Sequence, residues 1–322
     1  MIIGFLSNKL TLRGTEVAIY DYANYNELIL GNKSIIITRD YNVISNQFDV
    51  DKKAYDKFTS RFCVEYYDDG KVIESIENII DKHKITHLFI EKAGGWDGII
   101  AKNCKTLIHS VFDSTCPHGT VYTVLGQTIN NIFGTSYPVM PYMVDLPYTN
   151  ENLRSELGLP DDAIVFGRYG GKESFDIEYV HRAIKEILND RQDIYFIFMN
   201  TNSFYGHPRI KYLEGTSDMI YKRKFINTCD ALIHARSRGE TFGLTCAEFA
   251  ICKKPVITCK SSKEQEHLII LRDKAVLYDN KEEVYNIFMT FERGKYDMEN
   301  NGYMFYNPLN VIQILEKIFL KI

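Results

Sequence analysis

Short apolar runs alternate with helical patterns along this chain, and the alternation starts twice. In the first half, the runs MIIGFL and SIIIT are typical of buried strands, and a helical stretch from about 15 to 30 separates them. The segment ESIENIIDKH, which carries isoleucines on one helical face, and the strand-like runs THLFIE and KTLIHS extend the series. Strands that alternate with helices indicate a parallel sheet covered by helices on both faces.

The alternation begins again after Pro147. The strand-like runs AIVFGRYGG, DIYFIFMN, ALIHA, KPVITC and KAVLYD alternate with helical segments such as FDIEYVHRAIKEILND. The joint at 144–152, VDLPYTNEN, is polar and contains a proline, as domain linkers often do. A chain of 322 residues is also longer than a single core usually serves. The sequence therefore predicts an α/β protein with two tandem Rossmann-like, doubly wound domains that face a cleft.

The predicted domains span 1–146 and 147–305. The last segment, 306–322, has the pattern of an amphipathic helix. The sequence leaves the place of this helix open, and a return to the first domain is one arrangement. Ligands of such folds bind beyond the carboxyl ends of parallel strands, near helix N-termini. Functional residues are therefore expected in the loops that follow strands.

Charge and composition argue against several classes of partner. The formal net charge is −4, so no basic surface argues for nucleic acid. No apolar run approaches the ~20 residues of a membrane span, so we expect no transmembrane segment and at most a peripheral membrane contact. The seven cysteines show no C-x-x-C spacing, and the N-terminus has no basic stretch or cleavage site. These features favour a reduced, cytoplasmic protein. A homodimer is left open.

The segment RGETFGLTCAEFAICKKPVIT carries Glu240 and Glu248 around the start of a predicted helix that follows the strand ALIHA. The first N–H groups of a helix favour a phosphate. Those groups belong to Thr241, Phe242, Gly243 and Leu244. Two carboxylates there accept hydrogen bonds from vicinal hydroxyls, such as those of ribose or a hexose. On spacing alone, an equal alternative is that Glu240 caps the helix and Glu248 is a solvated helix residue.

The spacing E-x-F-G-x-x-x-x-E, followed by P-V-I, resembles the signature of retaining glycosyltransferases with the GT-B fold, above all the family-4 group. A G-R-x-x-x-K segment, in which the arginine is Arg168 and the lysine Lys172, extends the resemblance. It covers 144–290, and the first half of the chain matches only in outline. The chain departs from the pattern at Lys253 and Lys254, where the family has a small residue or glycine before the proline.

The resemblance implies a role for each matching residue. Arg168 and Lys172 would neutralise the diphosphate of a nucleotide-sugar, whose negative charge grows as the glycosidic bond breaks. Glu248 would hold the ribose hydroxyls, Glu240 would contact the transferred sugar, and the N–H groups around Phe242 would bind the phosphate or the sugar. The alternative for the two basic residues is a turn arginine and a solvated lysine.

The first domain offers weaker candidates. Gly14 resembles the family's glycine that faces the donor phosphate. The alternative is that this glycine only serves the backbone conformation of the strand–helix turn. His109 ends a strand expected to face the cleft, where the resemblance implies a histidine near the transferred sugar or the acceptor. An equal alternative is a satisfied histidine beside the core. Trp96 would stack on an acceptor sugar, and Asp113 is a further acceptor-side candidate. Simple loop packing is the alternative for Trp96.

No metal site is expected. The acidic pairs at 49–51 and 68–69 have the setting of solvated caps, and no His/Cys cluster has zinc spacing. The motifs of P-loop enzymes and of Rossmann dehydrogenases are absent. We therefore expect a metal-independent, hexosyltransferase-like enzyme without a cofactor, in which the nucleotide-sugar is a substrate. The donor would be a UDP-sugar first and a GDP-sugar second, and the acceptor a glycan or another hydroxyl compound. The alternatives are a sugar-nucleotide epimerase or phosphorylase on the same scaffold, and a catalytically silent nucleotide- or glycan-binding protein.

Overall fold

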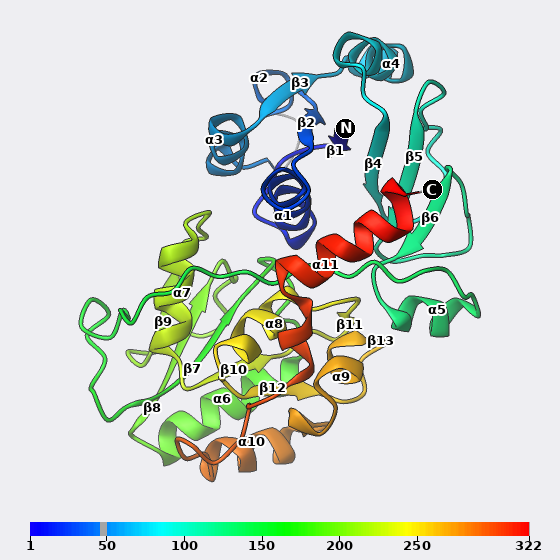
Figure 1. The fold of residues 1–322 in the computed structure, drawn as a ribbon. Helices are drawn as coiled ribbons and strands as arrows, with labels where there is room; N and C mark the ends of the chain where they lie inside the picture. The colour runs from blue at the N-terminus through cyan, green and yellow to red at the C-terminus, as the bar shows by residue number, and fades with distance from the viewer. Residues whose placement is uncertain (46–49, 322) are drawn as a thin grey trace. The chain divides into compact units, whose positions relative to one another are not determined.

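The computed structural model describes residues 1–45 and 50–321 and divides the chain into two compact units. The first unit comprises 1–143 together with 306–322, and the second comprises 144–305. The C-terminal segment belongs to the first unit although it follows the second in the chain (Figure 1). Within the described ranges, no helix is both long and apolar enough to cross a membrane.

The first unit is built on a parallel sheet with the strand order β3-β2-β1-β4-β5-β6. The strands are β1 (Ile2–Leu6), β2 (Lys33–Thr38), β3 (Cys63–Tyr66), β4 (His87–Lys92), β5 (Lys105–Ser110) and β6 (Val121–Val124). The central strands β1, β2 and β4 each contain a continuous apolar run because both of their faces are buried there.

Helices cover both faces of this sheet. They are α1 (Gly14–Leu28), α2 (Tyr41–Ile44), α3 (Lys52–Arg61), α4 (Val72–His83), α5 (Gln127–Phe133) and α11 (Pro308–Leu315). The isoleucine stripe of α4 packs in one cluster with Ile90 of β4. On the other face, the ring of Tyr22 from α1 contacts that of Phe89, with 5.2 Å between centroids. Neighbouring strand residues point to opposite faces, so β4 lies between the two helices.

The C-terminal helix α11 packs against α1. Its start is set locally, because Asn307 accepts a hydrogen bond from the N–H of Asn310 at 3.1 Å and Pro308 occupies the first turn. Beyond Leu315 the helix continues as a π-helical turn, in which the ring of Phe319 meets His87 of β4 edge-on, 5.0 Å between centroids. The amphipathic tail therefore helps to cover the first sheet.

The second unit repeats the plan, with the strand order β14-β12-β10-β7-β8-β9. The strands are β7 (Ile164–Tyr169), β8 (Ile194–Met199), β9 (Ile210–Leu213), β10 (Ala231–His234), β12 (Val256–Cys259) and β14 (Ala275–Tyr278). Numbered from the first strand of its own unit, each sheet has the order 3-2-1-4-5-6 of the doubly wound Rossmann fold. The prediction of two such units is confirmed.

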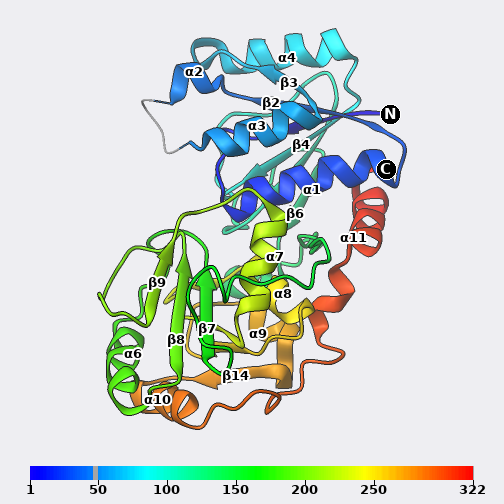
Figure 2. The ribbon, with the colours of Figure 1, turned by 90° about the vertical axis from the view of Figure 1, so that its left-hand side faces the viewer.

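Helices again lie on both sides of the sheet. They are α6 (Glu178–Asp190), α7 (Met219–Thr228), α8 (Leu244–Ile251), α9 (Glu266–Leu271) and α10 (Lys281–Met289). The apolar side of α6 is buried against phenylalanines of β7 and β8 and against α10. Figure 2 shows α6 on one side of β8 and α7 on the other. The core of the unit is thus formed on both faces of its sheet.

The strand order of the second sheet determines where its loops separate. β7 pairs with β10, although β8 and β9 lie between them in the chain. The chain therefore leaves these two neighbouring strands in opposite directions, which opens a crevice at their carboxyl ends. The loop 170–177 follows β7, and the loop 235–243 follows β10. Most of the residues predicted for the donor lie in or beside these two loops.

Candidate functional site

The loops after β7 and β10 are joined by the carboxylate of Asp176. Its two oxygens accept hydrogen bonds from the N–H and the hydroxyl of Ser237, each at 2.7 Å. The N–H of Asp176 also donates to the carbonyl of Ala235 at 2.9 Å. Three hydrogen bonds over this short contact hold the two loops in one arrangement, so the side chains that they carry have a defined geometry.

Arg168 lies near the end of β7, and only 4% of its surface is exposed. Its guanidinium donates to the carbonyl of Gly171 at 3.0 Å and to the hydroxyl of Ser174 at 2.6 Å, and it also bonds the hydroxyl of Thr201. Burial lowers the pKa of Arg168 to about 10, so the group stays charged at neutral pH. The guanidinium therefore holds the turn at 171–174 from a buried position, and its contact with a diphosphate stays a prediction. Lys172 is exposed in the same loop.

Gly170 makes room for this guanidinium. A side-chain carbon at that position would lie 2.8 Å from Nη2 of Arg168. The glycine-rich turn after β7 therefore has a specific local reason, which is the close approach of the arginine to the backbone. The loop contacts Arg168 through a carbonyl and a hydroxyl, while the negative charges of Glu240 and Asp176 act on the guanidinium through space.

Glu240 lies in the short strand β11 (Gly239–Glu240), which pairs with β13 (Glu264–Gln265). Its carboxylate accepts hydrogen bonds from Nε2 of His234 at 3.0 Å and from Nη1 of Arg236 at 2.9 Å. Burial by itself would raise the pKa of Glu240, but the His234 hydrogen bond and the Arg236 charge outweigh it and lower the pKa to about 2. Glu240 is thus an anion throughout the physiological range.

Glu240 does not cap helix α8. The N-cap position belongs to Gly243, and no side chain caps this helix. Gly243 has φ +84°, and a side-chain carbon there would lie 3.2 Å from both Cβ of Glu240 and the hydroxyl of Tyr303. The left-handed turn therefore requires glycine. It brings the carboxylate of Glu240 close to the beginning of α8.

The backbone at the start of α8 is held by side chains that point inward. Phe242 is 1% exposed, and its carbonyl accepts a hydrogen bond from the hydroxyl of Tyr303 at 2.5 Å. Thr241 is also buried, and Leu244 is half-buried at the first helical position. The N–H of Ala247 is bonded to the carbonyl of Gly243, whereas the N–H groups before it have no acceptor within the helix. The role of the N–H groups from Thr241 to Leu244 in binding a phosphate stays a prediction.

Glu248 is buried inside α8 and has two partners. Nζ of Lys222, from α7, lies 2.9 Å from its Oε1, and the hydroxyl of Tyr169, at the end of β7, donates to its Oε2. The alternative of a solvated helix residue is therefore wrong. Burial raises the pKa of Tyr169 well above its ordinary value, so this hydroxyl remains a donor. Three elements thus converge on one carboxylate at the strand ends.

The predicted position of His109 is wrong. The sequence suggested a side chain facing a cleft, whereas the structure encloses the ring completely, with no exposed surface. Nε2 of His109 bonds the carbonyl of Met140 at 2.8 Å, and the rings of Tyr22, Phe89 and Tyr142 surround it. Burial lowers its pKa to about 3, so it is neutral. His109 is therefore a core histidine, and we no longer consider it a candidate for contact with a sugar.

The other candidates of the first unit lie in loops at strand ends. Gly14 begins α1, and the carboxylate of Glu16, two residues further on, is buried and accepts a hydrogen bond from the hydroxyl of Thr11 at 2.6 Å. Trp96 is 56% exposed in the loop after β4, and its ring meets His118 edge-on. Their proposed roles stay predictions.

Asp113 has a local structural task. Its carboxylate accepts a hydrogen bond from the N–H of Thr115 at 2.7 Å, and its carbonyl accepts one from the hydroxyl of Tyr122 at 2.9 Å. The side chain thus stabilises the turn that follows β5. The contact with the N–H of Thr115 gives the carboxylate a structural role, and the acceptor-side role of Asp113 stays a prediction.

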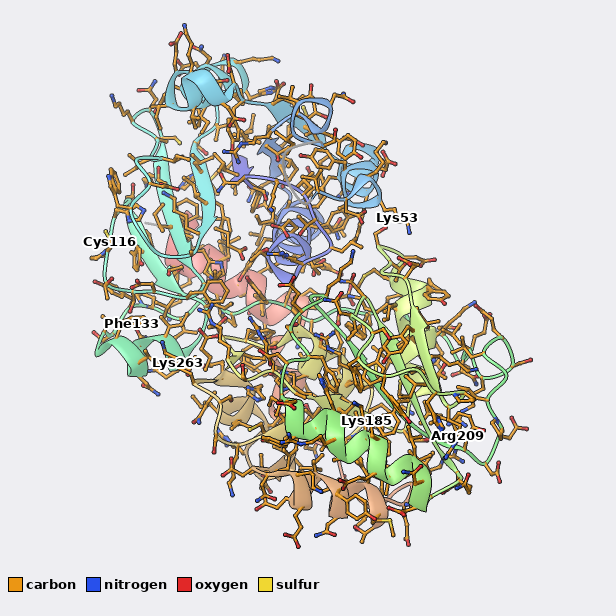
Figure 3. The ribbon with its side chains drawn as sticks, turned by 180° about the vertical axis from the view of Figure 1, so that it is seen from behind. Lys53, Cys116, Phe133, Lys185, Arg209 and Lys263 are labelled. Carbon is orange, nitrogen blue, oxygen red and sulfur yellow. The ribbon has the colours of Figure 1, made fainter. Side chains whose placement is uncertain are left out.

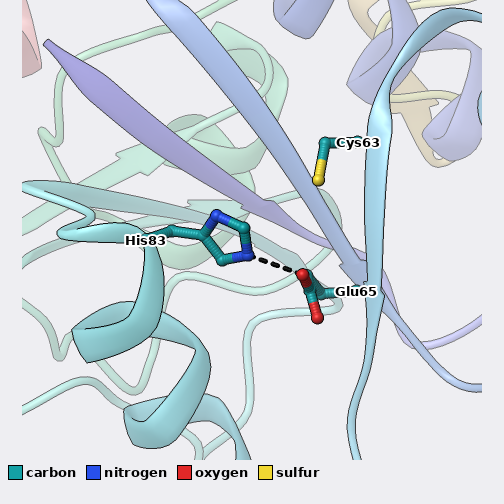
Figure 4. Close-up of side chains that lie close together, drawn as sticks. All are labelled: Cys63, Glu65 and His83. Atoms are coloured by element: carbon teal, nitrogen blue, oxygen red, sulfur yellow. Dashed lines mark hydrogen bonds and ion pairs between the residues drawn. The ribbon is translucent and has the colours of Figure 1, made fainter.

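Two aspartates of the acidic pairs are caps, whereas Asp69 accepts a hydrogen bond from Nε of Arg39 at 2.5 Å. Asp51 caps α3, and Asp68 accepts a hydrogen bond from the N–H of Gly70 at 2.8 Å, as expected. Asp49 lies outside the described residues. The sequence did not single out the group formed by Cys63, Glu65 and His83 (Figure 4).

This group has metal-ligating side chains, but its carboxylate is already paired. Oε1 of Glu65 lies 2.5 Å from Nε2 of His83 and 2.8 Å from Nζ of Lys82. A cation would have to displace an ammonium group from the oxygen that it needs, so we interpret the group as an ion pair at the sheet edge. The thiol of Cys63 is on an exposed residue beside it.

Sequence reasoning missed four partners of the two glutamates, namely Tyr169, Lys222, His234 and Arg236. Arg236 and His234 precede Glu240 by four and six positions, so their proximity was available from the local loop. Lys222 lies 26 positions before Glu248, and Tyr169 lies 79 before it. No local pattern connects residues at such separations.

Comparisons with known proteins identify the fold. No family model and no curated protein matches the chain. The crystal structure of Anabaena Alr3699/HepE in complex with UDP-glucose has a TM-score of 0.71 at 13% identity and covers 100% of both chains. A glycosyltransferase from Rickettsia africae ESF-5 has a TM-score of 0.63 at 15% identity, covering 99% of this chain and 94% of that one.

A third similar structure is a putative UDP-N-acetylglucosamine 2-epimerase from Listeria monocytogenes, with a TM-score of 0.58 at 11% identity. The match spans 100% of this chain and 97% of that one. At such identities the likeness establishes the fold. Two parallel, doubly wound sheets with flanking helices, matched over whole chains, are the GT-B architecture.

Proposed function

We propose that this protein is a glycosyltransferase that takes a sugar from a nucleotide-diphosphate donor and transfers it to a hydroxyl group of an acceptor. The observation that carries the proposal is the buried guanidinium of Arg168 at the end of β7. Among the described residues, its hydrogen-bond acceptors are a carbonyl and two hydroxyls, none of them charged. The carboxylates of Glu240 and Asp176 act on this cation through space but neither bonds it, so an anionic ligand at the strand ends would supply a bonded counter-ion.

The diphosphate would lie between the loop after β7 and the start of α8. Three of the five N–H groups of Arg168 donate to protein acceptors, which leaves two for a ligand. The exposed ammonium of Lys172 and the N–H groups at the start of α8 add positive potential. As the glycosidic bond breaks, charge accumulates on the leaving diphosphate, and fixed donors stabilise it. This proposal needs no metal ion.

Glu240 and Glu248 would bind hydroxyl groups and would not transfer protons. The low pKa of Glu240 keeps it ionised, so it accepts hydrogen bonds from the transferred sugar and cannot act as a general acid near neutral pH. Glu248 is already bonded to Lys222 and Tyr169. A carboxylate has about four lone-pair positions, so it retains room for the vicinal hydroxyls of a ribose.

The finer points of the proposal rest on the motif and on the similar structures. A UDP-sugar is the first donor to test, supported by the complex of the similar HepE structure with UDP-glucose, and a GDP-sugar is the second. Retention of the anomeric configuration is proposed from the E-x7-E resemblance. The acceptor is proposed to be a glycan or another hydroxyl compound, and Trp96 is the candidate for stacking on it.

The first experiment measures thermal stabilisation by UDP, GDP and ADP. A ligand at 100 times its dissociation constant adds roughly 2.7 kcal/mol. We expect one nucleotide to stabilise the wild type, and Arg168→Met and Lys172→Met to weaken that response. Lys185→Met is the matched control for Lys172→Met, because Lys185 is an exposed lysine on α6 (Figure 3). If no nucleotide stabilises the protein, or if all variants respond like the wild type, the donor site is wrong.

The second experiment separates the transferase from an epimerase on the same fold. The preferred nucleotide-sugar is incubated with and without a mixture of hydroxyl acceptors, and the products are resolved by chromatography. Transfer requires release of the nucleotide diphosphate together with a new glycoside. A changed sugar still attached to its nucleotide, formed without acceptor, would instead identify an epimerase. A protein that binds the nucleotide and changes nothing would be a silent binding protein.

A further inference from the structure

A chain of hydrogen bonds leads from Glu240 into the interior of the second unit. Glu240 bonds Nε2 of His234 at 3.0 Å, and Nδ1 of His234 bonds the hydroxyl of Thr258 at 2.9 Å. The same hydroxyl bonds Nε2 of His267 at 2.9 Å. His234 ends β10 and Thr258 is its paired residue on β12, while His267 comes from α9. All three residues behind Glu240 are buried.

The direction of the hydrogen bonds in this chain follows from both of its ends. A carboxylate with a pKa of about 2 only accepts, so the 3.0 Å contact with Glu240 forms only while Nε2 of His234 carries a proton. If His234 is neutral, its Nδ1 is an acceptor and the hydroxyl of Thr258 donates to it. The oxygen of Thr258 then accepts from Nε2–H of His267. In this arrangement every hydrogen bond has one donor and one acceptor.

The far end of the chain favours this arrangement over the reverse one. Nδ1 of His267 is buried and has no hydrogen-bond partner among the described residues. In the forward direction that nitrogen is an unpaired acceptor. In the reverse direction it would carry a buried, unpaired N–H, and an unsatisfied buried donor costs roughly 1–3 kcal/mol. The ring of His267 is neutral, because burial lowers its pKa to about 3, so it has one proton to place.

Other polar and charged groups lie around Glu240 and His234, but they do not contact the ring nitrogens of His234. Arg236 bonds the second oxygen of Glu240 at 2.9 Å, and the hydroxyl of Tyr278 donates to the carbonyl of His234 at 2.7 Å. Glu264, on β13, bonds Nε of Arg238 at 2.7 Å. None of these contacts reaches the imidazole nitrogens of His234, which bond Glu240 and Thr258.

We propose that Thr258 and His267 fix His234 in the tautomer with its proton on Nε2, so that His234 holds the carboxylate of Glu240 in position for the transferred sugar. His234 is thus a positioning residue, and Thr258 and His267 act through it. This inference rests on the proposed function for its consequence in catalysis, whereas the chain itself is a property of the folded protein. Arg236 orients one oxygen of Glu240, and His234 orients the other.

The decisive variant is Thr258→Val, which replaces the hydroxyl by a methyl group of similar size. Ring ¹⁵N NMR of histidine-labelled protein reports the tautomer of His234, and His234→Gln assigns its signals. We expect the wild type and Thr258→Ser to show only the Nε2–H form and Thr258→Val to show a mixture. Thr38→Val is the matched control, since Thr38 is a buried threonine at the end of a central strand of the other sheet.

The kinetic arm measures kcat and KM for the nucleotide-sugar. Loss of one orienting hydrogen bond, about 1 kcal/mol, predicts a fall in kcat on the order of fivefold to tenfold in Thr258→Val, with nucleotide affinity unchanged and activity restored by Thr258→Ser. An unchanged tautomer, or a changed tautomer with unchanged kcat, would overturn the proposal. If Thr258→Val does not fold, His267→Gln serves the same purpose. If the wild type shows no transfer activity, the proposed function is refuted. The NMR spectra still test whether the hydrogen-bond chain sets the tautomer of His234.

Discussion

Nζ of Lys222 lies 2.9 Å from Oε1 of Glu248, with both side chains largely buried, at 12% and 4% exposure. The pair joins α7 to α8, and the hydroxyl of Tyr169 completes it from β7. A buried carboxylate is unfavourable unless it is paired and hydrogen-bonded. Lys222 therefore compensates for a charge that the unit keeps at its strand ends.

We expect Lys222→Met to destabilise the second unit by about 3 kcal/mol, because it leaves the charge of Glu248 buried without its cation. Glu248→Gln should be milder, and the double variant Lys222→Met/Glu248→Gln should recover part of the loss. Urea unfolding of the four proteins gives the coupling energy between the two residues. Additive effects in this cycle would show that the ion pair contributes nothing.

Gly243→Ala should destabilise the protein by about 1–3 kcal/mol, because its φ of +84° is strained for any side chain. The new methyl group would also press on Glu240, so nucleotide-sugar turnover should fall more than nucleotide binding. Gly206→Ala is the control, since nothing lies within 4 Å of the added carbon and its φ is not in the left-handed region. Equal effects of the two substitutions in thermal unfolding would contradict this interpretation.

Lys253→Gly should stabilise the protein by up to about 1 kcal/mol. Lys253 follows α8 with φ +58°, a left-handed conformation that glycine adopts without strain. Its exposed ion pair with Glu299 contributes little. Lys254→Gly, at a position without positive φ, should destabilise instead. A loss of stability in Lys253→Gly would mean that the ion pair outweighs the strain.

Stability should fall on acidification through the buried His109. Its pKa is about 3 in the folded protein and about 6.5 when unfolded, so below pH 6.5 the unfolded chain takes up a proton that the folded one does not. The loss grows as the pH falls from 6.5 towards 3 and amounts to about 2 kcal/mol at pH 5. Urea unfolding at pH 8 and pH 5 gives the change in the free energy of unfolding between the two pH values. We expect this change to be smaller by about 2 kcal/mol in His109→Gln than in the wild type. An undiminished difference in the variant would contradict the assignment.

Much of the fold was determined locally. The continuous apolar runs at 164–169 and 194–199 indicate strands buried on both faces, and the periodic residues of 178–190 indicate a helix, because these patterns depend on near neighbours in the chain. The same holds for the loop before α8, where Glu240 and Gly243 occupy the positions that the motif assigns to them. Sequence reasoning therefore predicted two doubly wound units and the segment that carries the candidate site.

Only the tertiary structure decided which partners these residues meet. The pattern around His109 is that of any strand end, and its enclosure by Tyr22 and Tyr142 depends on segments far away in the chain. Lys222 reaches Glu248 because α7 and α8 lie beside β7, and the strand order brings His234 next to Thr258. Burial and pairing are set by contacts between distant segments, and a local stretch of sequence does not determine these contacts.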